Sequence, residues 1–454
     1  MASEQIQHVY REILTRAPEH DLVPSLDRIK AVTELLGDPQ HSFAAVHLSG
    51  TNGKTSTTRM VERLLREHGL RTGRFTSPHL TDVRERIAVD GEPLSEERFV
   101  QTYREVLPYI DLVDERSAAG GAPRMTFFEV LVVMAYAAFA DTPVDVAAIE
   151  VGMGGSWDAT NVVDARVAVL TPIAVDHERF LGRDPVSIAG EKAGIIKPGA
   201  VAVLAQQQVE VAEVLMRRSA EVGATVAREG LEFGVLQRDV AIGGQLVTLQ
   251  GLGAVYDEIF LPLHGQHQAH NAACALAAVE AFLNSGSAGA GGAARAAALD
   301  ADVVRAAFAD VDSPGRLEVV RRSPTVVVDA AHNPAGAAVL ADAVEEAFSF
   351  NRLVGVVAVL EDKDAEGILA ALEPVLDEVV VTRTSSARCI DPKELGDVAV
   401  EVFDEDRVRV VERLDEALDI AMGRAEEGGL IGGGVLATGS VTMAADVRLL
   451  LRRG

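Results

Sequence analysis

The segment Phe43–Ser56 reads FAAVHLSGTNGKTS and decides the fold of the chain around it. Its first part, Phe43–Leu48, is an apolar run that suits a buried β-strand, and a glycine loop follows at Gly50–Thr55. The next residues favour a helix whose apolar face holds Met60, Val61, Leu64 and Leu65. A strand, a Gly-Lys-Thr loop and a helix predict a phosphate-binding loop, because backbone N–H groups and the helix N-terminus attract anionic oxygens.

The loop departs from the general phosphate-loop pattern at one position. Leu48 stands where that pattern has its first glycine, so this loop is the shorter form G-T-N-G-K-T. We expect Lys54 to reach the terminal phosphates and the Thr55 hydroxyl to bind Mg²⁺. The alternatives are an ordinary glycine-rich turn for the segment and a helix cap for Thr55.

Composition limits the kinds of partner. The 454 residues include 42 Lys and Arg against 68 Asp and Glu, a formal net charge of -26. Such a chain repels nucleic acid and anionic membrane surfaces, so we expect neither as a partner. A phosphate ligand must then be attracted locally, by Lys54, helix dipoles and metal ions.

Cysteine content and apolar patterning indicate the compartment. Cys274 and Cys389 are too few for a disulfide framework or a metal quartet, and they fit a reducing cytoplasm. The first residues show no signal-peptide pattern. The longest apolar stretch, Phe127–Ala140, contains Glu129 and is too short to span a bilayer. We therefore expect a cytoplasmic protein. We also expect it to act as a monomer.

Strand and helix patterns alternate along the chain, which predicts a mostly parallel sheet covered on both faces. Short alternating runs between residues 225 and 262 favour a small antiparallel part. The best domain boundary is Asp312–Arg316, beyond which the alternation begins again. We predict a P-loop NTPase-like domain over 1–312 and a Rossmann-like α/β domain over 313–454. The Gly/Ala/Ser-rich segment 285–298 is expected to be a surface insertion.

The local patterns also predict individual elements. Ser25 is expected to cap the second helix. Helices are expected near residues 3–16, 95–110, 126–139 and 267–283, and strands near 144–151, 166–170, 325–329, 353–359, 377–382, 407–410 and 433–437.

Two polar positions follow neighbouring strands of the first domain. Glu150 ends one apolar strand, and Asp176-His177 follows the next. Ligands of open α/β sheets bind beyond the carboxyl ends of the strands, so Glu150 is placed to hold a metal ion against the phosphates. A turn cap is the alternative for Glu150, and a structural histidine is the alternative for His177.

The second domain opens with a similar arrangement. The segment Asp329–Pro334, DAAHNP, ends its first strand and begins its helix. Asp329, His332 and Asn333 therefore predict ligand contacts across a cleft, with capping by Asp329 or Asn333 as the alternative. From its residues alone, the Glu191–Gly194 segment with Lys192 is an ordinary solvated helix end.

These motifs, in this order, resemble the ATP-dependent Mur ligase superfamily, and within it the dihydrofolate synthase/folylpolyglutamate synthase branch. The resemblance covers nearly the whole chain. It rests on SGTNGKTS (49–56), TSPHL (76–80), EVGMGGSWDATN (150–161), DH (176–177), EKAGI (191–195), HQAHNAA (267–273), PGR (314–316) and DAAHNP (329–334). The loop is shared by all Mur ligases, whereas TSPHL and DATN are specific to the folate branch.

The resemblance implies a role for each matching position. ATP would be held by Gly50, Thr51, Asn52, Gly53, Lys54, Thr55, Ser56, Asn271, Arg316, Asp329 and His332. Two Mg²⁺ ions are implied, the first on Ser77 and Glu150 beside Thr55, the second on His177. Lys192 matches the lysine that family members carry as a carbamate, which is an extra carboxylate and a metal ligand. Lys54, Lys192 and His177 would be the catalytic groups.

The implied reaction joins L-glutamate to a dihydropteroate or (tetrahydro)folate carboxylate, with ATP forming an acyl phosphate. Pterin contacts would come from Ser25, Leu26, Asp27, Arg28, Thr126, Phe127, Phe128, Glu129, Trp157, Asp158 and Ala159. Two segments near these positions differ from the family's pattern. Ser156-Trp157 replaces the family's Arg-Leu, and Leu26-Asp27-Arg28 replaces its Leu-Glu-Arg.

Two other functions would also use a phosphate loop. A peptidoglycan-type Mur ligase would need an N-terminal domain for its nucleotide-sugar substrate, and only 49 residues precede Gly50. A nucleotide-dependent switch without ligase activity would turn over ATP without glutamate. The cleft residues of the second domain favour a ligase over the switch.

Overall fold

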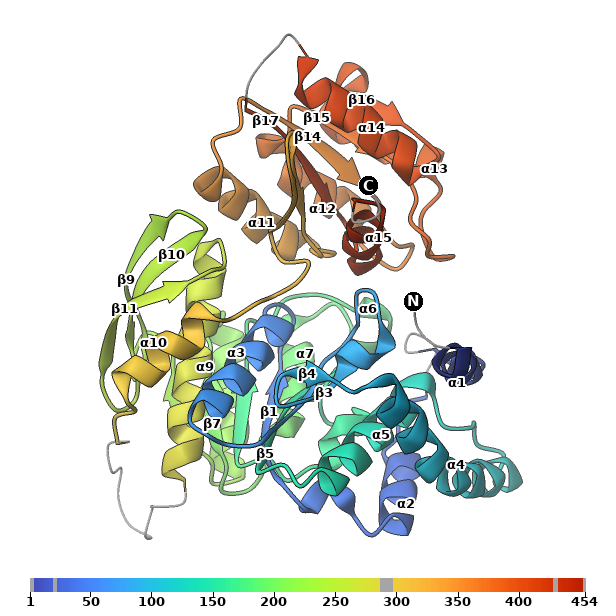
Figure 1. Cartoon of the computed structure of the whole chain (residues 1–454), viewed down its shortest axis with the longest axis vertical. Coiled ribbons are helices and arrows are strands. Elements are labelled where there is room, and N and C mark those ends of the chain that lie inside the picture. Colours follow the sequence, from blue (N-terminus) through green and yellow to red (C-terminus); the bar gives the residue numbers. More distant parts are fainter. Residues whose placement is uncertain (1–3, 19–22, 286–296, 428–431, 452–454) are drawn as a thin grey trace.

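The computed structural model describes residues 4–18, 23–285, 297–427 and 432–451. Within these residues it contains three sheets (Figure 1). Two of them are built from strands before residue 262 and the third from strands after residue 317. The predicted α/β fold, with a mostly parallel first sheet and a small antiparallel part, is confirmed.

The first sheet has the order β4-β3-β2-β5-β1-β6-β7-β8. Its strands are β1 (Ala44–Ser49), β2 (Thr72–Phe75), β3 (Ile87–Val89), β4 (Glu92–Pro93), β5 (Val146–Glu150), β6 (Val167–Leu170), β7 (Val201–Leu204) and β8 (Thr225–Arg228). The pairs from β2 to β8 are parallel, and β3 and β4 add antiparallel pairs at one edge. The register places Leu48 beside Glu150, so the phosphate loop and Glu150 leave the sheet at the same end.

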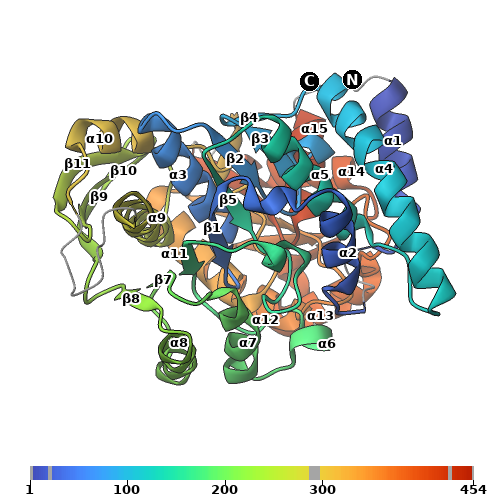
Figure 2. The same ribbon diagram turned by 90° about the horizontal axis from the view of Figure 1, so that it is seen from below.

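Helices cover both faces of this sheet (Figure 2). Side chains alternate along the strands, so Val46 and Leu48 pack on the face of α3 (Lys54–Glu67) and α9 (Gln266–Asn284). Other helices of this part of the chain cover the opposite face of the sheet and its edges. They are α1 (Glu4–Leu14), α2 (Asp27–Leu35), α4 (Glu96–Ala119), α5 (Phe127–Asp141), α6 (Glu178–Leu181), α7 (Pro185–Lys192) and α8 (Val209–Glu221).

Two local expectations for the helices have different outcomes. Thr126 and Glu129 form a reciprocal capping box at the start of α5, and this helix is buried as its apolar sequence predicts. The expectation that Ser25 caps α2 is wrong. Leu26 occupies the N-cap position, and the Ser25 hydroxyl instead accepts a hydrogen bond from the Asp27 amide at 3.0 Å.

The small antiparallel sheet contains β9 (Gly234–Ala241), β10 (Gly244–Gln250) and β11 (Val255–Leu261). It packs with α9 and α10 (Ala301–Ala309) in one hydrophobic cluster. Residues 225–228, expected among these strands, instead form β8 and extend the parallel sheet beside β7, because α8 returns the chain to that edge. Most of the expected insertion, residues 286–296, lies outside the described residues.

The third sheet has the order β12-β13-β17-β14-β15-β16. Its strands are β12 (Glu318–Arg322), β13 (Thr325–Val328), β14 (Arg352–Val357), β15 (Glu378–Val381), β16 (Val408–Val410) and β17 (Gly433–Thr438). The helices are α11 (Pro334–Ala347), α12 (Ala365–Leu372), α13 (Pro392–Phe403), α14 (Leu414–Ala425) and α15 (Val441–Leu451). The five parallel strands were expected. The antiparallel edge strand β12 was not, because its polar sequence has no apolar alternation.

In the described part of the chain, no helix combines the length and apolarity needed to cross a membrane.

A buried ion pair fixes α3, the helix of the phosphate loop, against β2. The Glu62 carboxylate accepts hydrogen bonds from the Thr72 hydroxyl at 2.6 Å and from the Arg74 guanidinium at 3.3 Å. Both side chains of the ion pair are at most 5% exposed. β2 leads directly to Ser77, and α3 follows the phosphate loop. The ion pair therefore sets the position of the phosphate loop relative to the segment that contains Ser77.

We predict that Glu62→Gln lowers the free energy of unfolding by about 3 kcal/mol, because it leaves Arg74 charged and buried without a counter-ion. Urea denaturation measures the change. The control is Glu67→Gln, which removes the partly exposed partner of Arg63 at the end of the same helix. It should cost about 1 kcal/mol at most. Equal losses in the two variants would contradict the assignment.

Candidate active site

A cavity of about 1400 Å³ lies between the first and third sheets. Loops at the carboxyl ends of β1, β5 and β6 line it from one side, and loops after β13, β14 and β17 line it from the other. Ligands of parallel sheets bind at this end of the strands. The two sheets therefore present their binding edges to a single cavity.

The phosphate loop forms the floor of this cavity, and two of its glycines are required by the geometry. Gly53 has φ +87°, and a Cβ on Gly50 would lie 1.9 Å from the Thr171 hydroxyl. The Lys54 ammonium donates to the carbonyl oxygens of Gly50 and Thr51, both at 3.1 Å. Burial lowers the pKa of Lys54, and the negative charges of Glu150 and Asp176 partly oppose that effect.

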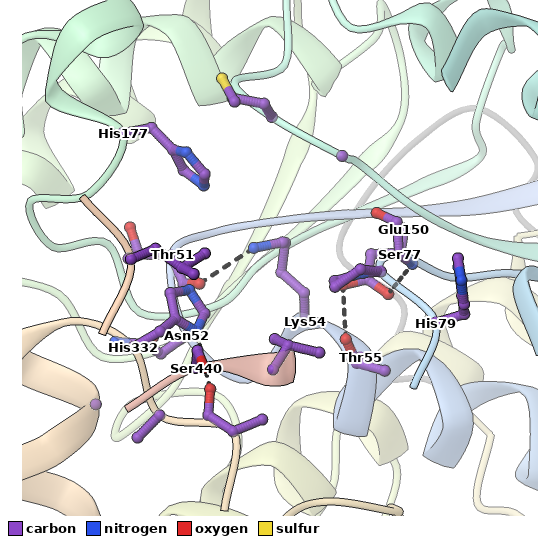
Figure 3. Close-up of a pocket in the computed structure, with 18 of the residues that line it drawn as sticks. Thr51, Asn52, Lys54, Thr55, Ser77, His79, Glu150, His177, His332 and Ser440 are labelled. Carbon is purple, nitrogen blue, oxygen red and sulfur yellow. Dashed lines mark hydrogen bonds between the residues drawn. The ribbon is translucent and has the colours of Figure 1, made fainter. Parts of the chain in front are cut away.

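Glu150 is fixed between the loop and the TSPHL segment (Figure 3). Its carboxylate accepts a hydrogen bond from the Thr55 hydroxyl at 2.8 Å and one from the Ser77 amide at 3.1 Å. Thr55 is therefore not the helix cap, a position that Gly53 occupies. Burial raises the pKa of Glu150, while the charge of Lys54 works in the opposite direction.

These groups fit a magnesium ion. Mg²⁺ prefers hard oxygen ligands and usually takes one or two carboxylates together with substrate phosphates and water. Glu150, Thr55 and Ser77 offer a carboxylate and two hydroxyl-bearing residues beside the loop. Within the described residues no three His, Cys, Asp or Glu side chains gather as a metal cluster, so phosphates and water would complete the coordination.

Asp176 and His177 lie where the two sheets face each other. Three side chains of the opposite edge contact the Asp176 carboxylate: Lys363 at 2.5 Å, Asn333 at 3.1 Å and His332 at 3.3 Å. Burial opposes ionisation of Asp176, but the His332 hydrogen bond and nearby cations hold its pKa well below the usual range. Burial lowers the pKa of His177 to about 3, so its imidazole is neutral at physiological pH, as a metal ligand must be.

Lys192 lies beneath the phosphate loop, not at a solvated helix end. Its side chain is buried, and its ammonium donates to the Gly50 carbonyl oxygen at 2.8 Å. Burial and the positive charge of Lys54 lower the pKa of Lys192 to about 7. A substantial fraction of this amine is therefore uncharged near neutral pH. Neither Lys192 nor Gly50 lines the cavity.

The expected nucleotide contacts surround the loop from both sides. Asn271, Arg316, Asp329 and His332 all line the cavity, as do Thr51, Asn52 and Ser56. The Ser56 hydroxyl is 2.9 Å from that of Ser313, in the segment joining the two sheets. The carboxylate of Asp329 accepts from the amides of Leu317 and Ala331, at 2.8 and 2.7 Å.

Asn333 serves both of the roles considered for it. It caps α11 by accepting from the Gly336 amide at 2.7 Å, and its amide group reaches Asn52 across the cavity at 3.1 Å.

The expected pterin contacts divide into two groups. Most of them line the cavity, namely Ser25, Arg28, Thr126, Phe127, Phe128, Glu129, Trp157, Asp158 and Ala159. Leu26 and Asp27 do not. Arg28 and Glu129 form a buried ion pair at 3.1 Å. Burial raises the pKa of Asp158 to about 6, although the amides of Met153 and Thr160 donate to its carboxylate.

Two residues that line the cavity, Lys363 and His79, were not among the expected site residues. Lys363 is one of six lysines in the chain and follows β14, so its rarity and its place at a strand end were available signals. His79 also lines the cavity and accepts a hydrogen bond from Arg86 at 2.9 Å. No local pattern separates His79 from the rest of TSPHL, because its partners come from elsewhere in the chain.

Known protein families match both parts of the chain. Residues 48–279 match the Mur ligase middle domain, and residues 315–441 match the Mur ligase, glutamate ligase domain. The dihydrofolate synthase/folylpolyglutamate synthase of Mycobacterium tuberculosis is 51% identical, over 99% of this chain and 94% of that protein.

Solved structures agree as well. Crystal structures of the M. tuberculosis folylpolyglutamate synthase complexed with ADP and AMPPCP match with a TM-score of 0.92, 51% identity and 99% coverage of both chains. The E. coli FolC in complex with DHPP and ADP matches with a TM-score of 0.83 and 28% identity, over 99% of this chain and 98% of that one.

These similarities favour the folate branch over peptidoglycan-type ligases. The match extends along both parts of the chain and includes the loops that form the cavity. The chain therefore belongs to the Mur ligase family of ATP-dependent ligases, in its dihydrofolate synthase/folylpolyglutamate synthase branch.

Proposed function

We propose that the cavity joins the amino group of L-glutamate to a carboxylate of dihydropteroate or of a (tetrahydro)folate polyglutamate, with ATP as the phosphoryl donor. The observation that carries this proposal is the contact of Glu150 with Thr55 of the phosphate loop, in a cavity that the Asp329–Asn333 edge also lines. A carboxylate is a poor acyl donor. Transfer of the γ-phosphoryl group gives an acyl phosphate, from which the amine displaces inorganic phosphate.

The chain's own groups bind, orient and stabilise charge in this reaction. Lys54 and the loop amides bind the phosphates, and the N-terminus of α3 adds its dipole. Asn271, Arg316, Asp329 and His332 hold the rest of the nucleotide from both edges of the cavity. Closure of the two edges over the substrates excludes water, which would otherwise hydrolyse the acyl phosphate.

We propose that Glu150, Ser77 and Thr55 bind one Mg²⁺ and that His177 and a carbamylated Lys192 bind a second. When bound, these ions supply positive charge that stabilises phosphoryl transfer. The neutral imidazole of His177 and the lowered pKa of Lys192 support these assignments. Two contacts with the phosphate loop also support them: Glu150 accepts from Thr55, and Lys192 donates to the Gly50 carbonyl oxygen.

The pterin ring is proposed to bind at the Trp157–Ala159 and Thr126–Glu129 end of the cavity. We further propose that residues 1–312 and 313–454 are the two domains, which meet at the Asp312–Arg316 segment, at the cavity edges and through the ion pair of Arg238 with Glu346. A monomer in the cytoplasm suffices, because one chain supplies both edges of the cavity and its two cysteines are unpaired.

The direct test follows ADP release with each substrate omitted in turn. A ligase of this kind releases ADP only when a pteroate or folate acid and L-glutamate are both present. Assays with dihydropteroate and with tetrahydrofolate, side by side, identify the acids that are used. ADP release that is independent of glutamate would instead support a nucleotide-dependent switch.

Substitution of Glu150 tests the proposed metal site. We expect Glu150→Gln to reduce kcat by roughly a hundredfold or more, because it removes the carboxylate that holds charge-stabilising Mg²⁺. Circular dichroism should be unchanged, since the glutamine oxygen can still accept from the Ser77 amide while its NH2 group donates to the Thr55 hydroxyl oxygen. The midpoint of Mg²⁺ activation should rise in parallel. A variant with native activity would remove Glu150 from the metal site.

Lys192 makes the activity depend on pH and on carbon dioxide. Because the pKa is lowered to about 7, the amine that can form a carbamate increases above pH 7 and is lost below it as the ammonium form takes over. We expect a carbamate resonance in carbon-13 NMR after exchange with labelled bicarbonate at pH 8. Lys192→Ala should lack that resonance and lose activity. A resonance that persists in Lys192→Ala would assign the carbamate to another amine.

A further inference from the structure

The basic side chains that line the cavity are Arg16, Arg28, Lys54, Arg86, Arg179, Arg316, Lys363 and Arg388. Four of them are ion-paired: Arg16 with Asp114, Arg28 with Glu129, Lys363 with Asp176 and Arg388 with Asp362. Lys54 belongs to the phosphate loop, Arg86 donates to His79, and Arg316 is placed with the nucleotide. Arg179 has none of these engagements.

Arg179 places a positive charge at the cavity wall. Its side chain is exposed, lines the cavity and makes no ion pair with any residue that the structure describes. Its guanidinium carbon lies 5.3 Å from the ring centroid of Phe180. A guanidinium stacked on an aromatic ring keeps its N–H donors in a plane that suits a carboxylate.

Phe180 connects the segment that carries this guanidinium to the interior of the protein. Phe180 packs against the buried cluster that contains Leu181 and Ile188, and Trp157 packs against the same cluster. His177 precedes Arg179 by two residues and also lines the cavity. Arg179 therefore lines the same cavity as Trp157, at the proposed ring end, and His177, at the proposed metal end.

We propose that Arg179 binds an α-carboxylate of the γ-glutamyl tail of a folate substrate. The inference rests on the proposed function and adds a determinant of acid preference to it. Dihydropteroate has one carboxylate, and that group reacts. Every glutamyl residue of a folate adds an α-carboxylate that is not consumed and must be neutralised inside a chain of net charge -26. Arg179 is the cavity cation that remains for this purpose.

The effect on turnover should separate the two classes of acid. An exposed ion pair stabilises binding modestly, so we expect Arg179→Gln to raise KM for tetrahydrofolate and its polyglutamates about two- to fivefold. KM for dihydropteroate, ATP and L-glutamate should stay the same, as should kcat. Arg179→Lys should recover part of the loss, because it restores the charge without the planar fork.

A neighbouring arginine supplies the matched control. Arg183 lies on the same segment and its side chain is 87% exposed. It does not line the cavity, although it pairs with Glu178, which does. Arg183→Gln removes the same charge without removing a cavity group. We expect native KM values for both classes of acid. A change equal to that of Arg179→Gln would attribute the effect to the general field of the segment and overturn the proposal.

Binding without turnover gives the decisive readout. Trp157 is the only tryptophan of the chain and lines the same cavity, so its fluorescence reports occupancy. Pteroate, pteroylmonoglutamate and pteroyltriglutamate form a series with the same ring and an increasing number of α-carboxylates. For the native chain we expect affinity to rise along the series and this gain to shrink with added salt.

The Arg179→Gln chain should lose the gain for the glutamylated ligands and bind pteroate as the native chain does. An undiminished gain, or a loss that includes pteroate, would overturn the proposal. A native chain that binds no member of the series would overturn the proposed function as well. Failure of the Arg179 assignment alone therefore remains distinguishable.

Discussion

The cavity depends on one constraint, the burial of the Glu150 carboxylate beside the phosphate loop. Its two oxygens accept from Thr55 and from Ser77, so a single side chain ties the loop after β1 to the segment after β2. A buried carboxylate is costly unless it has partners, and the partners here leave room for a metal ion and phosphates. Lys54 and the Mg²⁺ proposed to bind Glu150 would supply positive charge at this one place in a strongly acidic chain. Binding of the anionic phosphates requires that charge.

Several further contacts follow from the same need to manage charge. Lys54 and Lys192 both point their ammonium groups at carbonyl oxygens of the loop, Lys54 at Gly50 and Thr51, Lys192 at Gly50. Asp176 accepts from Lys363 and contacts His332, both of which come from the third sheet. The two edges of the cavity are thus held together by charge. The substrates would have to compete with some of these contacts.

The sequence predicts those features that depend on local patterns. A strand, a glycine loop and an amphipathic helix are adjacent in the chain, so the phosphate loop and α3 could be derived directly. Glu150 and Asp329 could be placed because each ends an apolar strand, and parallel strands bring their carboxyl ends together. The division into a parallel sheet, a small antiparallel sheet and a second α/β part followed from the same periodicities.

Other features depend on contacts between distant segments and had no local signal. Burial of Lys192 comes from its position beneath Gly50, and its lowered pKa comes from that burial and from Lys54. The strand Thr225–Arg228 has the sequence of a short antiparallel strand but joins the parallel sheet, because α8 brings it to the free edge of β7. The roles given to Leu26 and Asp27 came from the resemblance alone, and these two side chains lie outside the cavity lining.

The central claim, that the cavity activates a carboxylate as an acyl phosphate, is tested most directly by isotope transfer. A pteroate or folate acid labelled with oxygen-18 in its reacting carboxylate is converted with ATP and L-glutamate. If an acyl phosphate forms, one labelled oxygen for each amide appears in the inorganic phosphate. Phosphate that carries no label while the amide accumulates would contradict the account.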